Sequence, residues 1–236
     1  MKLGIIGAME VEVAALKECM ENKKETVVAG TVYCEGTLEQ LDAVIVQCGV
    51  GKVNAAMCVQ TLCDLFHVTH IVNTGVAGSL CAKLDIGDFV ISTDAVHHDM
   101  DVSVLGYTVG QVPGLTVREF PADEKLMGFA FGAADERNPG HAHMGRVASG
   151  DQFVSGKAAK EKILQDTQAM CTEMEGAAIA HCAWRNQVPF VIVRAISDKA
   201  DDSAQMDYPT FEAMAAKNCA AVTRRMAALL YASEQA

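Results

Sequence analysis

Residues 188–196 read VPFVIVRAI, an apolar run interrupted only by Arg194 near its end. A strand with one face in water alternates apolar and polar residues, whereas a nearly continuous apolar run is typical of a strand buried on both faces. Residues 70–74, HIVNT, have a similar character. Because strands of this kind occur mainly in parallel sheets covered by helices, the two runs indicate an α/β fold.

Around these runs, short β-branched stretches alternate with longer amphipathic ones. We expect strands at residues 3–7, 26–33, 43–48, 70–74, 88–95, 144–149, 169–173 and 190–196. Helices are expected at residues 9–21, 52–67, 122–137, 157–164, 175–187 and 208–232. This alternation predicts a central mixed, mostly parallel β-sheet with helices on both sides, a three-layer α/β sandwich. Because no linker, repeat or low-complexity segment divides the chain, we expect one domain over residues 1–236.

The balance of charge narrows the classes of partner. The 236 residues include 30 Asp and Glu against 19 Lys and Arg, a formal net charge of −11, and no four basic residues are consecutive. Neutralising phosphate groups requires clustered basic side chains. The composition therefore argues against nucleic acid and anionic membrane surfaces as partners.

Two features predict a cytoplasmic location. The start, MKLGIIGAMEVE, reaches two glutamates before it could form the uncharged core of a signal peptide, and no stretch approaches the ~18 apolar residues of a membrane span. The nine cysteines are odd in number and form no CxxC pair, which favours free thiols in a reducing compartment over a disulfide framework.

Carboxylates and small residues follow several of the expected strands. Glu12 follows the first, the Gly-rich turn TGVAG follows HIVNT, Phe153 follows the strand at 144–149, and Glu175 and Asp198 follow the last two. Ligands of open α/β sheets bind beyond the carboxyl ends of the strands, so these residues are expected to meet at one edge. Taken singly, each has a simpler interpretation: Glu12 and Glu175 as charges at helix N-termini, Asp198 as a cap, and Phe153 as a core residue.

Other motifs do not match known sites. GVGKVNA at 49–55 lacks the first glycine and the Ser or Thr of a phosphate-binding loop. HHDMD at 97–101 contains metal-ligand types, but neighbours in an extended segment point to opposite faces, so we expect no metal. There is no GxSxG motif, so a covalent nucleophile is not indicated. The segment of about residues 97–121 lacks periodicity and is too long for a simple connection, which predicts a functional loop.

Seven motifs, in order along the chain, resemble the 5′-methylthioadenosine/S-adenosylhomocysteine nucleosidase family. They are GAMEVEV at 7–13, CGVGKVNA at 48–55, NTGVAG at 73–78, HHDMDVSVLGYTVGQVPG at 97–114, SGDQFV at 149–154, EMEGAAIAH at 173–181 and VRAISDKAD at 193–201. The last two are specific to the wider nucleoside phosphorylase and nucleosidase superfamily. The first and fourth narrow the resemblance to the nucleosidases.

The resemblance implies a phosphorylase-like fold and hydrolysis of the bond between adenine and ribose, without a cofactor. The implied substrates are 5′-methylthioadenosine and S-adenosylhomocysteine, with 5′-deoxyadenosine as a further candidate, in methionine salvage and the removal of S-adenosylmethionine by-products. Breaking this bond requires an acid for the purine and a base for the attacking water. By resemblance, Asp198 protonates nitrogen-7 of adenine with the help of Ser197, Glu12 activates the water, and Glu175 binds the ribose hydroxyls. The pKa of Asp198 must then lie well above that of a free carboxyl group.

Further residues match binding positions of the family. Those expected around adenine, ribose and the water are Ala77, Gly78, Phe153, Val154, Met174 and Arg194. Those expected around the 5′-alkylthio group are Met9, Val50 and Tyr208. The loop at 97–113 resembles a segment that a partner subunit contributes to the neighbouring site through Val102, Leu105 and Pro113, which predicts a homodimer. This sequence lacks the serine or phenylalanine common in the family at three positions: Val76, Leu105 and Tyr208. The relative preference of the enzyme among the implied substrates therefore stays open.

Three alternatives stay open. A purine nucleoside phosphorylase would use phosphate, but Asn73 stands where hexameric phosphorylases carry an arginine, and Glu12 would repel a dianion. An aminodeoxyfutalosine nucleosidase would apply the same chemistry to another 5′ substituent. A non-catalytic nucleoside sensor would need neither the acid nor the base.

Overall fold

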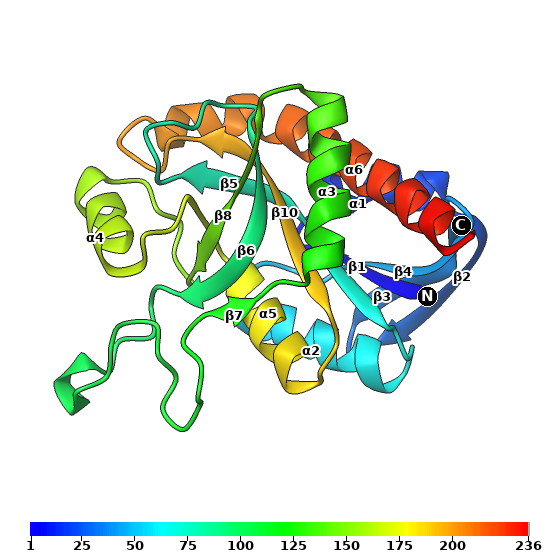
Figure 1. The fold of residues 1–236 in the computed structure, drawn as a ribbon, viewed down its shortest axis with the longest axis horizontal. Coiled ribbons are helices and arrows are strands. Elements are labelled where there is room, and N and C mark those ends of the chain that lie inside the picture. Colours follow the sequence, from blue (N-terminus) through cyan, green and yellow to red (C-terminus); the bar gives the residue numbers. More distant parts are fainter. Residues whose placement is uncertain (236) are drawn as a thin grey trace.

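The computed structural model describes residues 1–235, in which ten strands form one sheet and six α-helices pack around it (Figure 1). The strands are β1 Lys2–Gly7, β2 Glu21–Val28, β3 Thr31–Leu38, β4 Leu41–Gln47, β5 His70–Ser79, β6 Phe89–His97, β7 Phe120–Pro121, β8 Ala142–Ser149, β9 Cys171–Glu173 and β10 Phe190–Asp198. The helices are α1 Glu10–Cys19, α2 Lys52–Asp64, α3 Glu124–Arg137, α4 Lys157–Thr167, α5 Gly176–Arg185 and α6 Ala204–Gln235, with a 3₁₀ helix η1 at Ser103–Leu105. The predicted mixed α/β architecture is confirmed.

The sheet closes partly on itself. Its order is β10-β6-β8-β9-β5-β1-β4-β3-β2, and β10 also pairs with β5, so that β5, β10, β6, β8 and β9 form a ring. Pairings among β1, β4, β5 and β10 are parallel, as are those among β6, β8 and β9, whereas β10–β6 and β5–β9 are antiparallel. Thr172 lies opposite Gly78 and Cys171 opposite Ser79, so β9 pairs with the carboxyl-terminal end of β5. The ring therefore brings strand ends from both parallel groups to one place.

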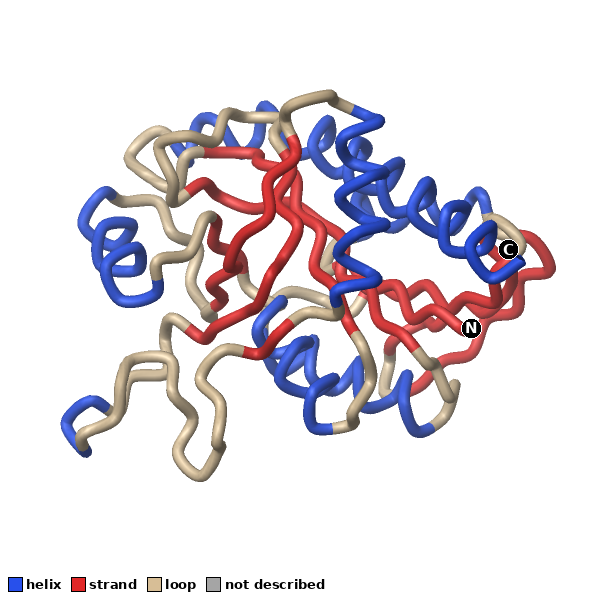
Figure 2. The backbone as a smooth tube through the Cα atoms, in the orientation of Figure 1, coloured by secondary structure: helices blue, strands red, loops and turns tan. Residues whose placement is uncertain are grey.

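Helices cover both faces of the sheet. Figures 1 and 2 show α1, α3 and α6 on one side and α2 and α5 on the other. A separate apolar core lies between the sheet and each of these helix groups, and α4 packs on a smaller cluster at one end. None of the helices within residues 1–235 combines the length and the apolar character needed to cross a bilayer.

The structure corrects two local predictions. Residues 26–33, expected as one strand, contain the β2–β3 hairpin, because Ala29 and Gly30 adopt φ of 49° and 80° and reverse the chain. TGVAG, expected as a turn, is the middle and end of β5, and β10 likewise continues through Asp198. The small residues of TGVAG therefore act within a strand, where they let neighbouring side chains approach the backbone.

Candidate active site

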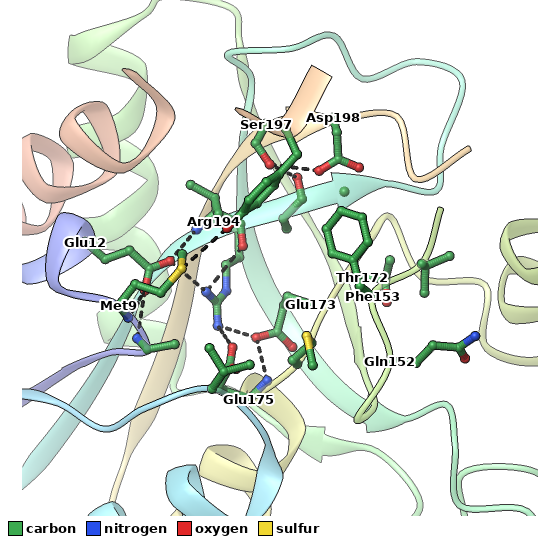
Figure 3. Close-up of a pocket in the computed structure, with 18 residues that line it drawn as sticks. Met9, Glu12, Gln152, Phe153, Thr172, Glu173, Glu175, Arg194, Ser197 and Asp198 are labelled. Atoms are coloured by element: carbon green, nitrogen blue, oxygen red, sulfur yellow. Dashed lines mark hydrogen bonds and ion pairs between the residues drawn. The ribbon is translucent and has the colours of Figure 1, made fainter. Parts of the chain in front are cut away.

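A pocket of about 610 Å³ lies where β1, β5, β8, β9 and β10 end or pass, within the usual size range of small-molecule sites. It is lined by every residue predicted for the site within one chain: Met9, Glu12, Val50, Ala77, Gly78, Phe153, Val154, Met174, Glu175, Arg194, Ser197, Asp198 and Tyr208. Five further lining residues had not been assigned a binding role: Ala8, Val76, Gln152, Thr172 and Glu173. Figure 3 shows Glu12 and Asp198 on opposite sides of this pocket.

Glu12 lies in the first turn of α1 and is almost fully buried. Its Oε2 accepts the N–H groups of Ala8 at 2.7 Å and Met9 at 2.9 Å, and its Oε1 accepts that of Val76 at 3.1 Å. Burial raises the pKa of this carboxyl, while the charge of Arg194 and the three N–H groups oppose the rise. Glu12 therefore caps a helix, as its simpler interpretation predicts, and also faces the pocket.

Arg194 is 1% exposed and lies among carboxylates. Its Nη2 donates to Glu173 Oε2 and, at 2.5 Å, to Asn73 Oδ1, while Glu175 Oε2 lies 3.8 Å away and Glu12 Oε1 lies 4.0 Å from Nη1. Burial lowers the pKa of Arg194, but the surrounding glutamates raise it to a value above the ordinary one. The guanidinium is therefore a fixed positive charge at the base of the pocket (Figure 3).

Glu175 immediately precedes α5, and its Oε1 accepts the backbone N–H of Gly51 at 2.8 Å. Burial and the like charge of Glu173 raise the pKa of Glu175 to about 7, against the opposing effect of Arg194. Glu173 itself was missed by the sequence analysis. The signal was present in EMEG, where two glutamates are two residues apart, but the role of the first depends on partners that are distant in sequence.

Asp198, on the other side of the pocket, is the last residue of β10 and is 3% exposed. Its Oδ2 accepts the Ser197 hydroxyl at 2.9 Å, and its Oδ1 accepts the Ala200 N–H at 2.8 Å. Burial raises the pKa of Asp198, the Ala200 N–H and the Ser197 hydroxyl oppose the rise, and the nearby carboxylates Asp207 and Asp201 add to it. A protonated carboxyl group here can donate a hydrogen bond, or its proton, to a ligand atom.

Aromatic and thioether side chains form the open part of the pocket. The ring of Phe153 is half-exposed and meets Tyr208 edge to face, with ring centroids 5.4 Å apart, so its interpretation as a core residue is wrong. The Tyr208 hydroxyl lies 2.9 Å from Glu212 Oε1 and 3.4 Å from Met9 Sδ. This wall offers a flat ring for stacking beside an apolar compartment.

The loop after β6 does not reach the pocket of its own chain. Val102, Leu105 and Pro113 are not among the lining residues, and Leu105 in η1 is 70% exposed. In the HHDMD segment, Asp99 pairs with Lys52 at 2.6 Å, whereas the His97 ring meets those of Phe120 and His181 edge to face. Among residues 1–235, no group of three or more His, Cys, Asp and Glu side chains has a metal-binding arrangement.

Comparisons with known proteins agree with this geometry. Residues 2–228 match the family model described as the phosphorylase superfamily. A 5′-methylthioadenosine/S-adenosylhomocysteine nucleosidase of Geobacillus thermodenitrificans is 42% identical, over 96% of each chain. The nucleosidase of that name from Neisseria meningitidis, solved with methylthio-immucillin-A, is 37% identical with a TM-score of 0.93 and covers 97% of this chain and 99% of its own. Futalosine hydrolase of Helicobacter pylori is 31% identical with a TM-score of 0.90, over 96% and 97% of the two chains.

The match is thus nearly end to end in both sequence and structure. It includes a superfamily model and relatives that share one name. This chain belongs to the phosphorylase superfamily and, within it, to the 5′-methylthioadenosine/S-adenosylhomocysteine nucleosidase family.

Proposed function

We propose that the protein hydrolyses the N-glycosidic bond of 5′-methylthioadenosine and S-adenosylhomocysteine, releasing adenine and the 5-substituted ribose. One observation carries the proposal: two buried carboxyl groups with raised pKa values, Glu12 and Asp198, face a single nucleoside-sized pocket from opposite sides. Two carboxyl groups that flank a scissile glycosidic bond can act as acid and base with a water molecule between them.

The charged neighbours of these two groups differ in sign. Both groups accept hydrogen bonds that favour their ionised forms. The charge of Arg194 further favours ionised Glu12, whereas the charges of Asp207 and Asp201 favour protonated Asp198. In the proposed mechanism, the Ser197 hydroxyl holds Asp198, which donates its proton to nitrogen-7 of adenine. Glu12 removes a proton from the attacking water. Environments that push two carboxyl pKa values apart assign the acid and the base.

The remaining residues have roles in binding. We assign Glu175 to the ribose hydroxyls, where its charge also stabilises the cationic sugar of the transition state. Phe153 stacks on adenine, Val154 presents its backbone to the purine edge, and Met174 contacts the ribose. We propose that Ala77 and Gly78 let the ligand approach the backbone closely. Met9, Val50 and Tyr208 line the compartment for the 5′ substituent.

Hydrolysis is favoured over phosphorolysis by the charge of the pocket. Among the described lining residues, Arg194 is the one cation, and it already faces Glu12, Glu173 and Glu175. A phosphate dianion would meet net negative charge there. An aminodeoxyfutalosine nucleosidase is the second candidate, supported by the similarity to futalosine hydrolase.

We also propose a cytoplasmic homodimer in which the loop after β6 completes the partner's 5′ compartment through Val102, Leu105 and Pro113. Val104 and Leu105 are 92% and 70% exposed at the tip of this loop, which projects from the body of the protein in Figure 1. Apolar side chains so exposed are typical of an interaction site.

The test is adenine release from 5′-methylthioadenosine, S-adenosylhomocysteine and 6-amino-6-deoxyfutalosine by the purified protein. We expect turnover of the first two. Faster turnover of the third would favour the second candidate, and tight binding of all three without adenine release would identify a sensor.

A further inference from the structure

Glu173, at the end of β9, is a buried carboxylate for which the mechanism above has no role. Its Oε1 accepts the Ser149 hydroxyl and the Gly176 N–H at 3.0 Å. Its Oε2 accepts the N–H groups of Glu175 at 3.1 Å and Gly176 at 2.8 Å, and also Arg194 Nη2. This is a larger set of donors than either Glu12 or Asp198 receives, and the bond from Arg194 is charge-assisted, which makes it one of the stronger kinds of hydrogen bond.

These contacts belong to a chain of buried polar groups that crosses the sheet. Ser149 also accepts the Ala177 N–H at 2.7 Å, and Asn73, which accepts from Arg194, donates to Ile6 O at 2.9 Å. This row of hydrogen-bonded groups therefore joins β8, β9, β10, β5 and β1 beneath the pocket. A buried network in which each member has partners restricts its side chains to one arrangement.

The distances around Arg194 show which carboxylate holds it. Glu173 is in direct contact, whereas Glu175 and Glu12 lie 3.8 and 4.0 Å away, beyond hydrogen-bonding distance. If Glu173 lost its charge, the guanidinium would be attracted to the two remaining glutamates. A carboxylate in a close ion pair with arginine is a weaker base.

We propose, on the basis of the hydrolytic function above, that Glu173 is a positioning residue that keeps Arg194 out of a close ion pair with Glu12 and fixes the backbone of Glu175. It acts through these residues and makes no contact with the reacting atoms. The ionisable groups near Glu173 are Arg194 on β10, Glu175 before α5, Cys171 on β9 and His98 after β6, and Glu12 on α1 lies 4.0 Å from Arg194.

The decisive variant is Glu173→Gln, which keeps the shape and one acceptor oxygen but removes the charge. Loss of this charge removes a like charge beside Glu175 and so lowers its pKa. It also lets Arg194 move closer to Glu12, which lowers the pKa of Glu12. We expect kcat for 5′-methylthioadenosine to fall about tenfold and the acidic limb of the pH–kcat/KM profile to move down by about one pH unit. KM is expected to change by less than about threefold.

Three other variants separate this effect from simple loss of packing. Ser149→Ala removes a donor to Glu173 but leaves its charge, so the acidic limb should stay in place. Glu173→Asp keeps the charge on a shorter side chain. It should move the acidic limb downward by less than Glu173→Gln does. Glu161→Gln, on an exposed part of α4, should match the wild type.

The proposal would be overturned if the acidic limb of the pH–kcat/KM profile did not shift in Glu173→Gln, whatever the value of kcat. If Glu173→Gln does not fold by circular dichroism, Glu173→Asp carries the same test: a lowered limb supports the proposal, and an unmoved one overturns it. Adenine release by the wild type in the same assay tests the hydrolytic function independently.

Discussion

At the scale of single residues, Glu12 and Asp198 are equally buried and differ in their neighbours. Glu12 faces Arg194 and three N–H groups, whereas Asp198 has further carboxylates nearby. Both residues could be predicted from the sequence, because each follows a strand and matches a motif. Glu173 could not, because its partners Ser149, Arg194 and Gly176 come together only when β8, β9 and β10 are adjacent.

Asp198→Asn should reduce kcat for adenine release by about 10²- to 10⁴-fold, since an amide cannot supply the proton. Binding of 5′-methylthioadenosine, measured by calorimetry, should change little, because the Ser197 and Ala200 contacts lie on the protein side. Asp202→Asn, at an exposed neighbouring position, is the matched control and should keep full activity. Equal activity in the two variants would remove Asp198 from the mechanism.

Gly75 is a residue whose importance only the structure reveals. A Cβ atom there would lie well under 3.0 Å from both Arg194 Nη1 and Glu12 Oε1. Gly75→Ala should therefore separate these two groups and lower kcat/KM by about 10²-fold, as expected when a catalytic group is displaced by about 1 Å. Gly128→Ala in α3, where the added atom meets nothing within 4 Å, should leave activity unchanged. Wild-type kinetics for Gly75→Ala would show that this close approach is not required.

At the scale of elements, the predicted helices and strands agree with the structure where the apolar pattern is long. The exceptions have local causes. The β2–β3 reversal at Ala29–Gly30 lacks the Asn-Gly or Asp-Gly signal that marks most two-residue hairpins. TGVAG looks like a turn because it is rich in small residues, but in β5 the missing side chains make room for Arg194 and Asp198. The sequence predicts close approach of a ligand at Ala77 and Gly78, but neither the strand nor the approach of these protein side chains.

The loop carrying η1 offers a test of the proposed homodimer. Leu105→Asp places a charge on the exposed tip, so we expect light scattering to report a monomer and KM for 5′-methylthioadenosine to rise about tenfold. Val27→Asp, at an equally exposed apolar position in β2, should leave both the mass and KM unchanged. A Leu105→Asp protein that remains dimeric with wild-type KM would contradict the assigned role of the loop.

At the scale of the whole molecule, the buried carboxyl groups of the active site lower the free energy of unfolding when they are ionised. The pKa values of Glu12, Glu175 and Asp198 are all raised by burial. A carboxyl group whose pKa is higher in the folded state stabilises the protein below its unfolded pKa, and this contribution is lost as pH rises through the folded value. The ionised site therefore destabilises the protein at neutral and higher pH.

Glu175→Gln tests this relation, because its pKa rises from 4.5 to about 7 on folding. At pH 8 the variant should melt about 2–4 °C above the wild type, and the difference should shrink as pH falls toward 4.5. Calorimetric scans at several pH values measure the difference, with the exposed Glu161→Gln as the control. A variant that is less stable than the wild type at pH 8 would show that ionised Glu175 is stabilising.

In the proposed mechanism, water activated by Glu12 is the nucleophile. The most direct measurement is mass spectrometry of the sugar formed from 5′-methylthioadenosine in ¹⁸O-labelled water containing phosphate. We expect 5-methylthioribose carrying one ¹⁸O atom at its anomeric carbon, formed at a rate independent of phosphate. Formation of unlabelled 5-methylthioribose 1-phosphate would contradict this mechanism.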